Sequence, residues 1–239
     1  MIGRRLVNGV ESSAISVDDR GLQYGDGLFE TRSAQDGRVL EGLGNGTVKL
    51  IVTRGPGPRS YRPPADPAVT RIVVSSAPKP RNDPEEGIVV RLCDTPLGLN
   101  PRLAGIKHLN RLEQVLACAE WDDPAIAEGL MSSVDGRIVC ATAANVFLVR
   151  EGRLLTPAIR DCGVAGVMRG VVLAAAREAG IDSEILDLRL VDFSAADEVF
   201  LTNAITGVRP VGEILGLRRY AAPGDVTRIL LERTARAGA

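Results

Sequence analysis

The chain has 239 residues, a formal net charge of −1 and a single histidine. Hydrophobic and charged fractions of 45% and 25% are ordinary for a folded, water-soluble protein, and the lack of basic runs argues against nucleic acid as a partner. No apolar stretch reaches membrane-spanning length, and no signal-like region begins the chain. The four cysteines form no CxxC pair, which argues against a metal site or a disulfide framework and predicts a cytoplasmic protein.

The first part of the chain is expected to form strands separated by turns, because β-branched residues alternate there between clusters of Gly, Pro, Asn and Asp. Asp36-Gly37 is a hairpin signal between two of these strands. The expected strands are 5–10, 14–17, 28–32, 48–53, 70–77 and 87–93, and the hairpin at Asp36-Gly37 joins 31–34 to 38–40.

A stretch rich in proline and glycine follows, and it is the best candidate for a linker between two domains. The predicted domains are therefore 1–95 and 105–239, joined by 96–104, with the active site expected between them. After the linker, apolar residues at helical spacing (Leu109, Leu112, Leu116 and Ala119) predict a helix that begins near Lys107. The further expected elements are a hairpin of 129–134 and 137–149, strands 154–156 and 198–202, and helices 170–179 and 225–236.

Lys107 is the first candidate for a catalytic residue. Of the 29 basic residues only Lys49, Lys79 and Lys107 are lysines, and lysine, unlike arginine, can lose its proton and form an imine. Burial at the start of an apolar helix would lower its pKa and favour the nucleophilic amine. The alternative is an ordinary solvated lysine near a helix start.

The segment Gly-Ile-Lys-His-Leu-Asn-Arg-Leu-Glu-Gln at 105–114 resembles the lysine segment of the fold-type IV pyridoxal-phosphate (PLP) enzymes. These include branched-chain aminotransferases, D-amino-acid aminotransferases and aminodeoxychorismate lyases, and the sequence of this segment is most similar to that of the lyases. The resemblance implies an α+β fold of the D-amino-acid-aminotransferase type, with a small N-terminal α/β domain and a larger, β-barrel-like C-terminal domain with helices. It also implies a homodimer in which PLP forms an imine with Lys107.

Two further motifs carry the same resemblance in the first domain. The string Asp-Arg-Gly-x-x-Tyr-Gly-Asp-Gly-x-Phe-Glu at 19–30 is similar to the family's N-terminal signature, which implies that Tyr24, Phe29 and Thr31 line the pocket. The loop 54–61 is similar to the Thr-Arg-Gly-x-Gly-x-Arg-Gly-Tyr loop of the lyases. Arg59 and Tyr61 are therefore candidates for binding a substrate carboxylate, although a solvent-facing hairpin end would look the same.

In the second domain, Gly163–Arg169 resembles the family's phosphate-binding turn, Gly-x-x-Gly-[Ile/Val]-x-Arg, which implies that the Val167 and Met168 amides hold the cofactor phosphate. The loop after the strand 198–202 resembles the second phosphate loop and implies the same role for the Ala204 and Ile205 amides. Asn145 belongs to a strand similar to the family's Glu-x-x-x-x-Asn-hydrophobic-Phe motif.

The sequence departs from the family in two places. The glycine-rich join 41–47 stands where relatives carry a helical excursion with a phosphate-binding arginine. Cys140 stands where most members have the glutamate that faces the pyridine nitrogen of PLP, and a neutral thiol supplies no compensating charge there. The alternative for Cys140 is a buried core cysteine.

The resemblance implies conversion of 4-amino-4-deoxychorismate to 4-aminobenzoate and pyruvate, a step toward folate. Lys107 then serves as covalent anchor and as general base and acid, with Thr31 beside it. Two alternatives stay open: an aminotransferase of the same fold, acting on branched-chain or D-amino acids, and a non-catalytic relative that retains only the fold.

Overall fold

The structure, a computed structural model, describes residues 3–34, 46–78 and 83–237. It divides into two compact units. Unit 1 comprises Met1–Arg81 together with Lys107–Arg111, and unit 2 comprises Asn82–Ile106 and Leu112–Ala239. The division lies earlier than the predicted boundary at residue 95, because the strand after residue 87 pairs within the sheet of unit 2. The expected hairpin at 36–37, the strand 38–40 and most of the join 41–47 lie outside the described residues.

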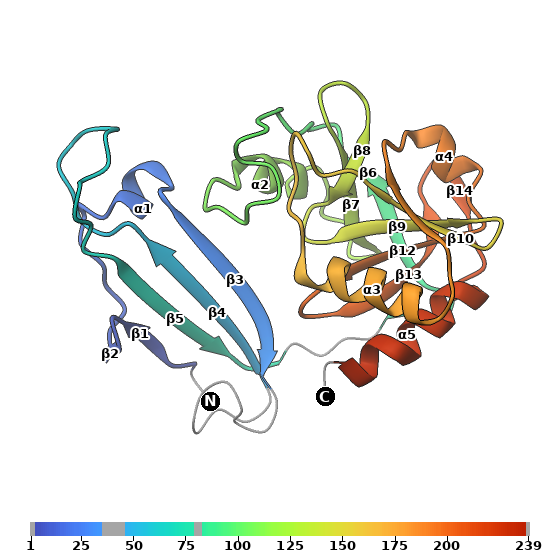
Figure 1. The fold of residues 1–239 in the computed structure, drawn as a ribbon, viewed down its shortest axis with the longest axis horizontal. Coiled ribbons are helices and arrows are strands. Elements are labelled where there is room, and N and C mark those ends of the chain that lie inside the picture. The colour runs from blue at the N-terminus through green and yellow to red at the C-terminus, as the bar shows by residue number, and fades with distance from the viewer. Residues whose placement is uncertain (1–2, 35–45, 79–82, 238–239) are drawn as a thin grey trace. The chain divides into compact units, whose positions relative to one another are not determined.

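Unit 1 is built on an antiparallel sheet of five strands in the order β2-β1-β5-β4-β3 (Figure 1). The long pairings are β3 with β4 and β4 with β5, and their register is unbroken. One short helix, α1 (Arg20–Tyr24), precedes β3. The strands are β1 (Arg5–Val7), β2 (Val10–Glu11), β3 (Gly27–Ala34), β4 (Gly46–Thr53) and β5 (Thr70–Ser76). The strand expected at 14–17 is absent: residues 14–16 pair with no other strand and have no regular structure, and a turn begins at Val17.

Unit 2 is a mixed sheet in the order β11-β10-β9-β12-β13-β6-β7-β8, with the short β14 on β13. Its strands are β6 (Ile88–Leu92), β7 (Ile126–Ser132), β8 (Ile138–Ala141), β9 (Asn145–Arg150), β10 (Arg153–Pro157), β11 (Ser183–Leu186), β12 (Glu198–Asn203), β13 (Gly207–Ile214) and β14 (Arg218–Arg219). Its helices are α2 (Leu112–Cys118), α3 (Val167–Glu178), α4 (Leu190–Ser194) and α5 (Asp225–Ala237).

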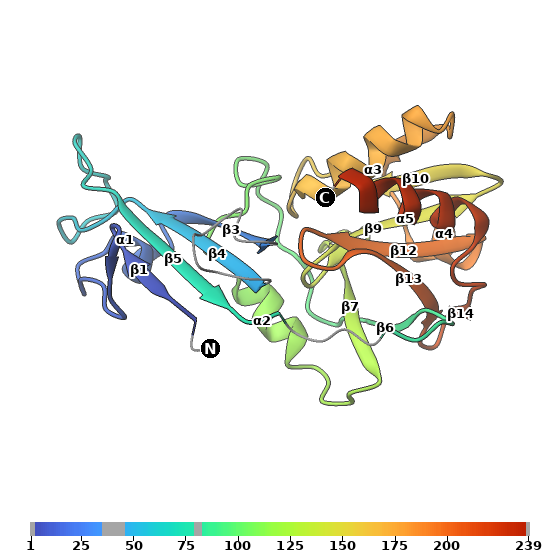
Figure 2. The ribbon, with the colours of Figure 1, turned by 90° about the horizontal axis from the view of Figure 1, so that it is seen from below.

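The central strands β9 and β12 are buried on both faces, since successive side chains of a strand point to opposite sides of the sheet. Leu148 and Leu201 enter a core inside the curled sheet. Phe147 and Phe200 point the other way and stack at 5.0 Å under α3 and α5. Figure 2 shows these two helices over β9, β12 and β13. The continuous apolar runs in these strands follow from this double burial.

The helix predicted near Lys107 begins later and turns a different face inward. Helix α2 starts at Leu112, and Leu112 and Leu116 are 68% and 53% exposed, whereas Ala117 is fully buried. The apolar spacing indicated a helix correctly but not the face that packs against β7. None of the helices in the described parts of the chain is long and apolar enough to cross a membrane.

Candidate active site

Lys107 lies in an extended segment and not in a helix. The Phe29 amide donates to the Lys107 carbonyl at 3.0 Å, and the Leu109 amide donates to the Gly27 carbonyl at 3.0 Å. Leu28 and His108 form the antiparallel bridge between these two bonds. The segment therefore extends the sheet of unit 1 beyond β3. This long-range pairing, and not the helix expected from the sequence, fixes the backbone of Lys107.

The Lys107 ammonium lies over the ring of Phe29, with the nitrogen 4.7 Å from the ring centroid. Burial lowers the pKa of Lys107, and the positive charges of Arg111 and Lys49 act in the same direction, while Glu30 opposes them. A half-buried lysine of this kind gives up its proton more readily than a solvated one. The prediction of a lowered pKa is thus confirmed, although the cause lies in a sheet and not at a helix start.

A second lysine approaches the same aromatic ring. The Lys49 nitrogen is 4.9 Å from the Phe29 centroid, and Lys49 on β4 is paired directly with Thr31 on β3. Directly opposed residues share a face of the sheet, so Thr31 lies beside Lys49. The sequence interpretation did not single out Lys49 as a site residue. The scarcity of lysine and the alternation of β4 were the signals that could have found it.

Arg20 fixes the loop that carries Arg59 and Tyr61. It is 3% exposed and donates from Nη1 to the Ser60 carbonyl and from Nη2 to the Tyr61 carbonyl at 3.1 Å. Its Nε donates to Asp26 Oδ2 at 2.9 Å. A buried guanidinium with carbonyl and carboxylate acceptors defines the path of the loop backbone.

Asp26 also accepts a hydrogen bond from Arg54 Nε at 2.8 Å. Burial alone would raise the pKa of Asp26, but the hydrogen bonds from Arg54 and Arg20 outweigh it and hold the pKa below its usual value. Arg54, the other arginine of the loop 54–61, is therefore engaged by a carboxylate of the protein itself. Arg59 is exposed.

The two tyrosines of the predicted pocket meet at the same loop. Tyr61 is 87% exposed, and its ring centroid lies 5.4 Å from that of Tyr24. Tyr24 in turn lies under the Arg20 guanidinium, 4.9 Å from its carbon. Unit 1 thus brings Tyr24 and Tyr61 together, and it separately brings together Phe29, Lys49 and Lys107.

In unit 2, the turn before α3 is suited to an anion. Helix α3 begins after Gly166 with no side-chain cap and no acidic residue in its first turn, so the Val167 and Met168 amides lie at the positive end of the helix. Asn145 holds the turn: its Nδ2 donates to the Val164 carbonyl at 2.8 Å and its Oδ1 accepts from the Gly166 amide at 3.1 Å. A Cβ at Gly166 would lie 2.3 Å from that Oδ1, so this approach requires glycine.

The second predicted phosphate loop follows β12 and is organised by Asn203. Its Oδ1 accepts from the Ile205 and Thr206 amides at 2.9 and 2.8 Å. Its Nδ2 donates to the Ala143 carbonyl at 3.2 Å, which ties this loop to the turn before Asn145. The Ile205 amide, predicted as an anion donor, is thus engaged by Asn203 in this structure.

A sequence profile of the aminotransferase class IV family matches residues 27–214, which include the Lys107 segment and both turns. The chain belongs to the aminotransferase class IV family. It is 33% identical over 244 residues to the aminodeoxychorismate lyase of Vibrio harveyi, covering 87% of this chain and 90% of that protein. It is 29% identical over 264 residues to a putative branched-chain-amino-acid aminotransferase of Methanocaldococcus jannaschii, covering 93% and 91%.

Among solved structures, the chain is similar to 4-amino-4-deoxychorismate lyase from Pseudomonas aeruginosa, with a TM-score of 0.93 and 38% identity over 97% of this chain and 98% of that one. The alignment with the Vibrio relative runs over 244 positions but spans 87% of this chain, about 208 residues. About 36 positions of that relative therefore have no counterpart here.

Class IV enzymes depend on PLP, and the residues of this class IV chain fit the cofactor at two of its three anchoring points. The Lys107 amine has a lowered pKa and suits the aldehyde. The uncapped start of α3, held by Asn145, suits the phosphate. The third point, the ring nitrogen, differs from the pattern of most class IV members.

Cys140 occupies the position expected to face the ring nitrogen. It lies on β8, is 6% exposed and packs in a cluster with Leu97, Met131 and Cys162. These apolar neighbours make a poor environment for a carboxylate and an ordinary one for a thiol. The burial of Cys140 is compatible both with a core residue and with a residue beside the cofactor ring.

Proposed function

We propose that this chain is an aminodeoxychorismate lyase, which converts 4-amino-4-deoxychorismate to 4-aminobenzoate and pyruvate with bound PLP. The observation that carries the proposal is the half-buried Lys107 amine over the Phe29 ring, which Lys49 also approaches, in a chain that is 33% and 38% identical to two such lyases along most of its length. Lys107 supplies the nucleophile, and the Val167 and Met168 amides supply the phosphate site.

In this mechanism Lys107 has two tasks. Its neutral amine would hold the cofactor at the aldehyde, and as a free amine it would take the proton from the carbon that bears the substrate nitrogen. When bound, PLP serves as the sink for the electron pair left on that carbon. The enolpyruvyl group then leaves from the neighbouring carbon, takes up a proton and becomes pyruvate, while the ring becomes aromatic.

The remaining residues of unit 1 bind and orient. Thr31, paired with Lys49, places a hydroxyl on the face that carries both lysines. Lys49 and Arg59 provide positive charge for the two carboxylates of the substrate, Lys49 from a strand and Arg59 from the loop braced by Arg20. Tyr24, Phe29 and Tyr61 provide aromatic surface for the substrate ring.

Lys49→Met is expected to lower kcat/KM by about 10- to 100-fold, because a charge-assisted hydrogen bond to a carboxylate contributes about 1.5–3 kcal/mol. Most of the loss is expected in KM, since Lys49 binds the substrate and does not transfer a proton. Steady-state kinetics measure both constants. Lys49→Arg, which keeps the charge, serves as the control. Equal losses in the two variants, or a loss confined to kcat, would contradict a binding role.

Cys140→Glu is expected to slow the dissociation of PLP, because a carboxylate opposite the ring nitrogen would form a charge-assisted hydrogen bond that the thiol cannot form. The half-time of cofactor loss on dilution, followed by absorbance, measures the effect. Cys162→Ser in the same apolar cluster controls for general disturbance of the core. An unchanged half-time and spectrum would place residue 140 away from the cofactor ring.

The experiment that tests the function has two steps. The purified chain is mixed with PLP and reduced with borohydride, and the modified residue is located by mass spectrometry; modification of Lys107 is expected. It is then given 4-amino-4-deoxychorismate without an amino acceptor, and release of 4-aminobenzoate and pyruvate is measured. An aminotransferase would instead convert PLP to its amine form with an amino donor, and a non-catalytic relative would not modify Lys107 at all.

We propose further that the chain is a homodimer in the cytoplasm. In unit 1, Leu28 and Val52 are paired on one face of the sheet and are 52% and 44% exposed, and Leu50 on the same face is 39% exposed. Exposed apolar surface of this kind supports association. Light scattering after size-exclusion chromatography measures the mass, and a monomer at micromolar concentration would refute the dimer.

A further inference from the structure

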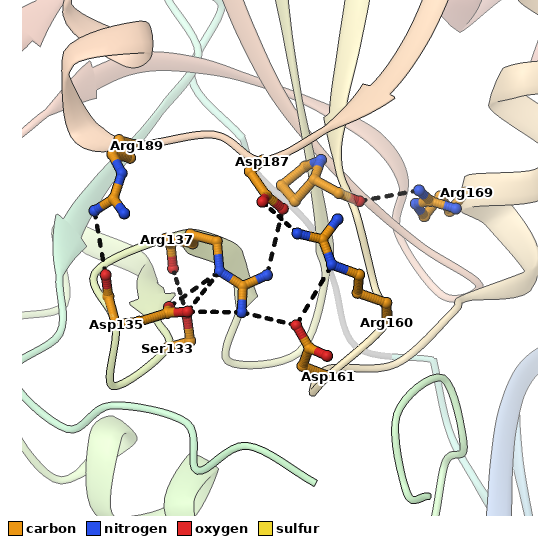
Figure 3. Close-up of polar contacts among 9 residues, drawn as sticks. Ser133, Asp135, Arg137, Arg160, Asp161, Arg169, Asp187 and Arg189 are labelled. Carbon is orange, nitrogen blue, oxygen red and sulfur yellow. Dashed lines mark hydrogen bonds and ion pairs between the residues drawn. The ribbon is translucent and has the colours of Figure 1, made fainter. Parts of the chain in front are cut away.

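A buried arginine in unit 2 joins three segments that are distant in the sequence. Arg137 is 7% exposed and lies between β7 and β8. Its Nε donates to the two carboxylate oxygens of Asp135 at 3.1 and 2.9 Å, its Nη1 to Asp187 at 3.3 Å and its Nη2 to Asp161 at 2.9 Å. Figure 3 shows the guanidinium between these three carboxylates.

A second arginine closes the network. Arg160 forms ion pairs with Asp187 and, at 3.5 Å, with Asp161, so these two carboxylates are each shared by two arginines (Figure 3). Together, Asp135, Arg137, Arg160, Asp161 and Asp187 form the Arg137 network. The Arg137 side chain is 9% exposed, whereas the side chains of Asp135, Asp161 and Asp187 are 42%, 27% and 38% exposed. Ion pairs that are partly open to water contribute little net stability, but their geometry is directional. They therefore fix where the connected segments lie more than how stable they are.

One of the connected segments is the loop between β10 and α3, which leads to the anion-binding turn. Asp161 lies in this loop, two residues before Gly163. Where the loop begins, the Pro157 carbonyl accepts from Arg169 Nη2 in the first turn of α3 at 3.0 Å. The loop that presents the α3 amides is thus bound to its own helix at one point and to Arg137 at another.

The same loop also holds the segment that leads to Lys107. The Asn100 amide donates to the Asp161 carbonyl at 2.7 Å. The Gly105 amide donates to the Gly163 carbonyl at 3.0 Å, and the Ala165 amide donates to the Gly105 carbonyl at 3.2 Å. Gly105 is two residues before Lys107 in the chain.

We propose that Arg137 and Asp161 are positioning residues that hold the anion-binding turn in register with the segment that enters Lys107. The inference rests on the proposed function, in which one ligand is held at both places. Two attachment points reinforce each other only when their spacing matches that of the ligand. Within unit 2, Asp161 connects to Arg137 through its side chain and to Asn100 through its carbonyl, so it joins the loop that presents the α3 amides to the segment that leads to Lys107.

The test compares PLP with pyridoxal, which has the aldehyde but no phosphate. Pyridoxal needs only the Lys107 amine, whereas PLP gains affinity from the turn as well. Asp161→Asn removes one ion pair of Arg137 and keeps the shape of the side chain. The preference of this variant for PLP over pyridoxal is the ratio of the two dissociation constants, which absorbance measures. This ratio is expected to fall by about 10-fold, as for the loss of one charge-assisted hydrogen bond.

The matched control is Glu184→Gln, which breaks the exposed Arg153–Glu184 ion pair between β10 and β11 in the same unit. It is expected to leave the ratio unchanged. Thermal unfolding of both variants verifies that unit 2 is folded. Arg137→Lys, which keeps the charge but loses the planar fork, is expected to lower the ratio as Asp161→Asn does.

An unchanged ratio in Asp161→Asn, with or without a lower melting temperature, would show that the network is merely structural. It would overturn this inference but leave the proposed function intact. A ratio that falls equally in Glu184→Gln would overturn it too. If the unaltered chain shows no borohydride-reducible bond between PLP and Lys107, the proposed function fails and the inference fails with it. The wild-type measurement therefore separates the two cases.

Discussion

Lys107→Ala is expected to lose at least about 10⁴-fold in turnover, because the amine supplies both the covalent attachment of the cofactor and the proton transfer. The fold is expected to persist. The side chain gives the protein an ammonium over the Phe29 ring, worth about 0.5–1 kcal/mol, and the strand pairing of its backbone does not depend on the side chain. Turnover and circular dichroism are measured on the same preparation.

Borohydride reduction provides the control for this prediction. Lys49→Ala removes the other ammonium at the Phe29 ring and is expected to keep the reducible bond to PLP at Lys107. Lys107→Ala is expected to lose that bond. Near-normal turnover of Lys107→Ala, or trapping of PLP at Lys49 in the wild-type chain, would contradict the assignment of the nucleophile.

The strands β3, β4, β5, β6, β10 and β12 were predictable from the sequence, because alternation and turn residues are local signals. The strands β11 and β13 were not predicted, and the strand predicted at 137–149 is divided into β8 and β9. The position of Lys107 was not predictable either. Leu109, Leu112 and Leu116 suggested a helix from Lys107 onward, but the pairing of the Lys107 segment with β3 is a contact between distant parts of the chain, and it prevails over local periodicity. Because the Lys107 segment pairs with β3, helix α2 begins only at Leu112.

The residues of the candidate site were predictable where they belong to short sequence motifs. Phe29 and Thr31 lie near each other at the start of β3, and Val167 and Met168 begin α3, three residues before the helix predicted at 170–179. Lys49 was not predicted as a site residue, because its role depends on its register with Thr31 across two strands. Register is set by the whole sheet and leaves no motif in the sequence.

The Arg137 network could not be predicted from the sequence. Asp135, Asp161 and Asp187 each follow or precede a strand and look like ordinary turn residues, and nothing local relates one to another. Their meeting depends on how the β7–β8 hairpin, the loop before α3 and the end of β11 pack together. Arg20, the buried arginine of unit 1, lies within a recognisable motif together with its acceptor Asp26, but the Ser60 and Tyr61 carbonyls that it also binds lie in another loop.

Arg20→Met is expected to lower the free energy of unfolding by about 3 kcal/mol, because it removes charge-assisted hydrogen bonds from a buried site and leaves acceptors unsatisfied. The estimate is at the low end for a buried ion pair, since Asp26 is 23% exposed and retains Arg54. Urea unfolding followed by fluorescence measures the change.

The same substitution is expected to act on the substrate loop. Without Arg20, the Ser60 and Tyr61 carbonyls lose their donors, so proteolysis between residues 54 and 61 is expected to accelerate and KM to rise, because Arg59 no longer has a defined path. Arg71→Met, an exposed arginine on β5, is the control and is expected to change stability by less than about 0.5 kcal/mol. If Arg20→Met kept the loop resistant and KM unchanged while losing stability, the guanidinium would support the sheet and not the substrate site.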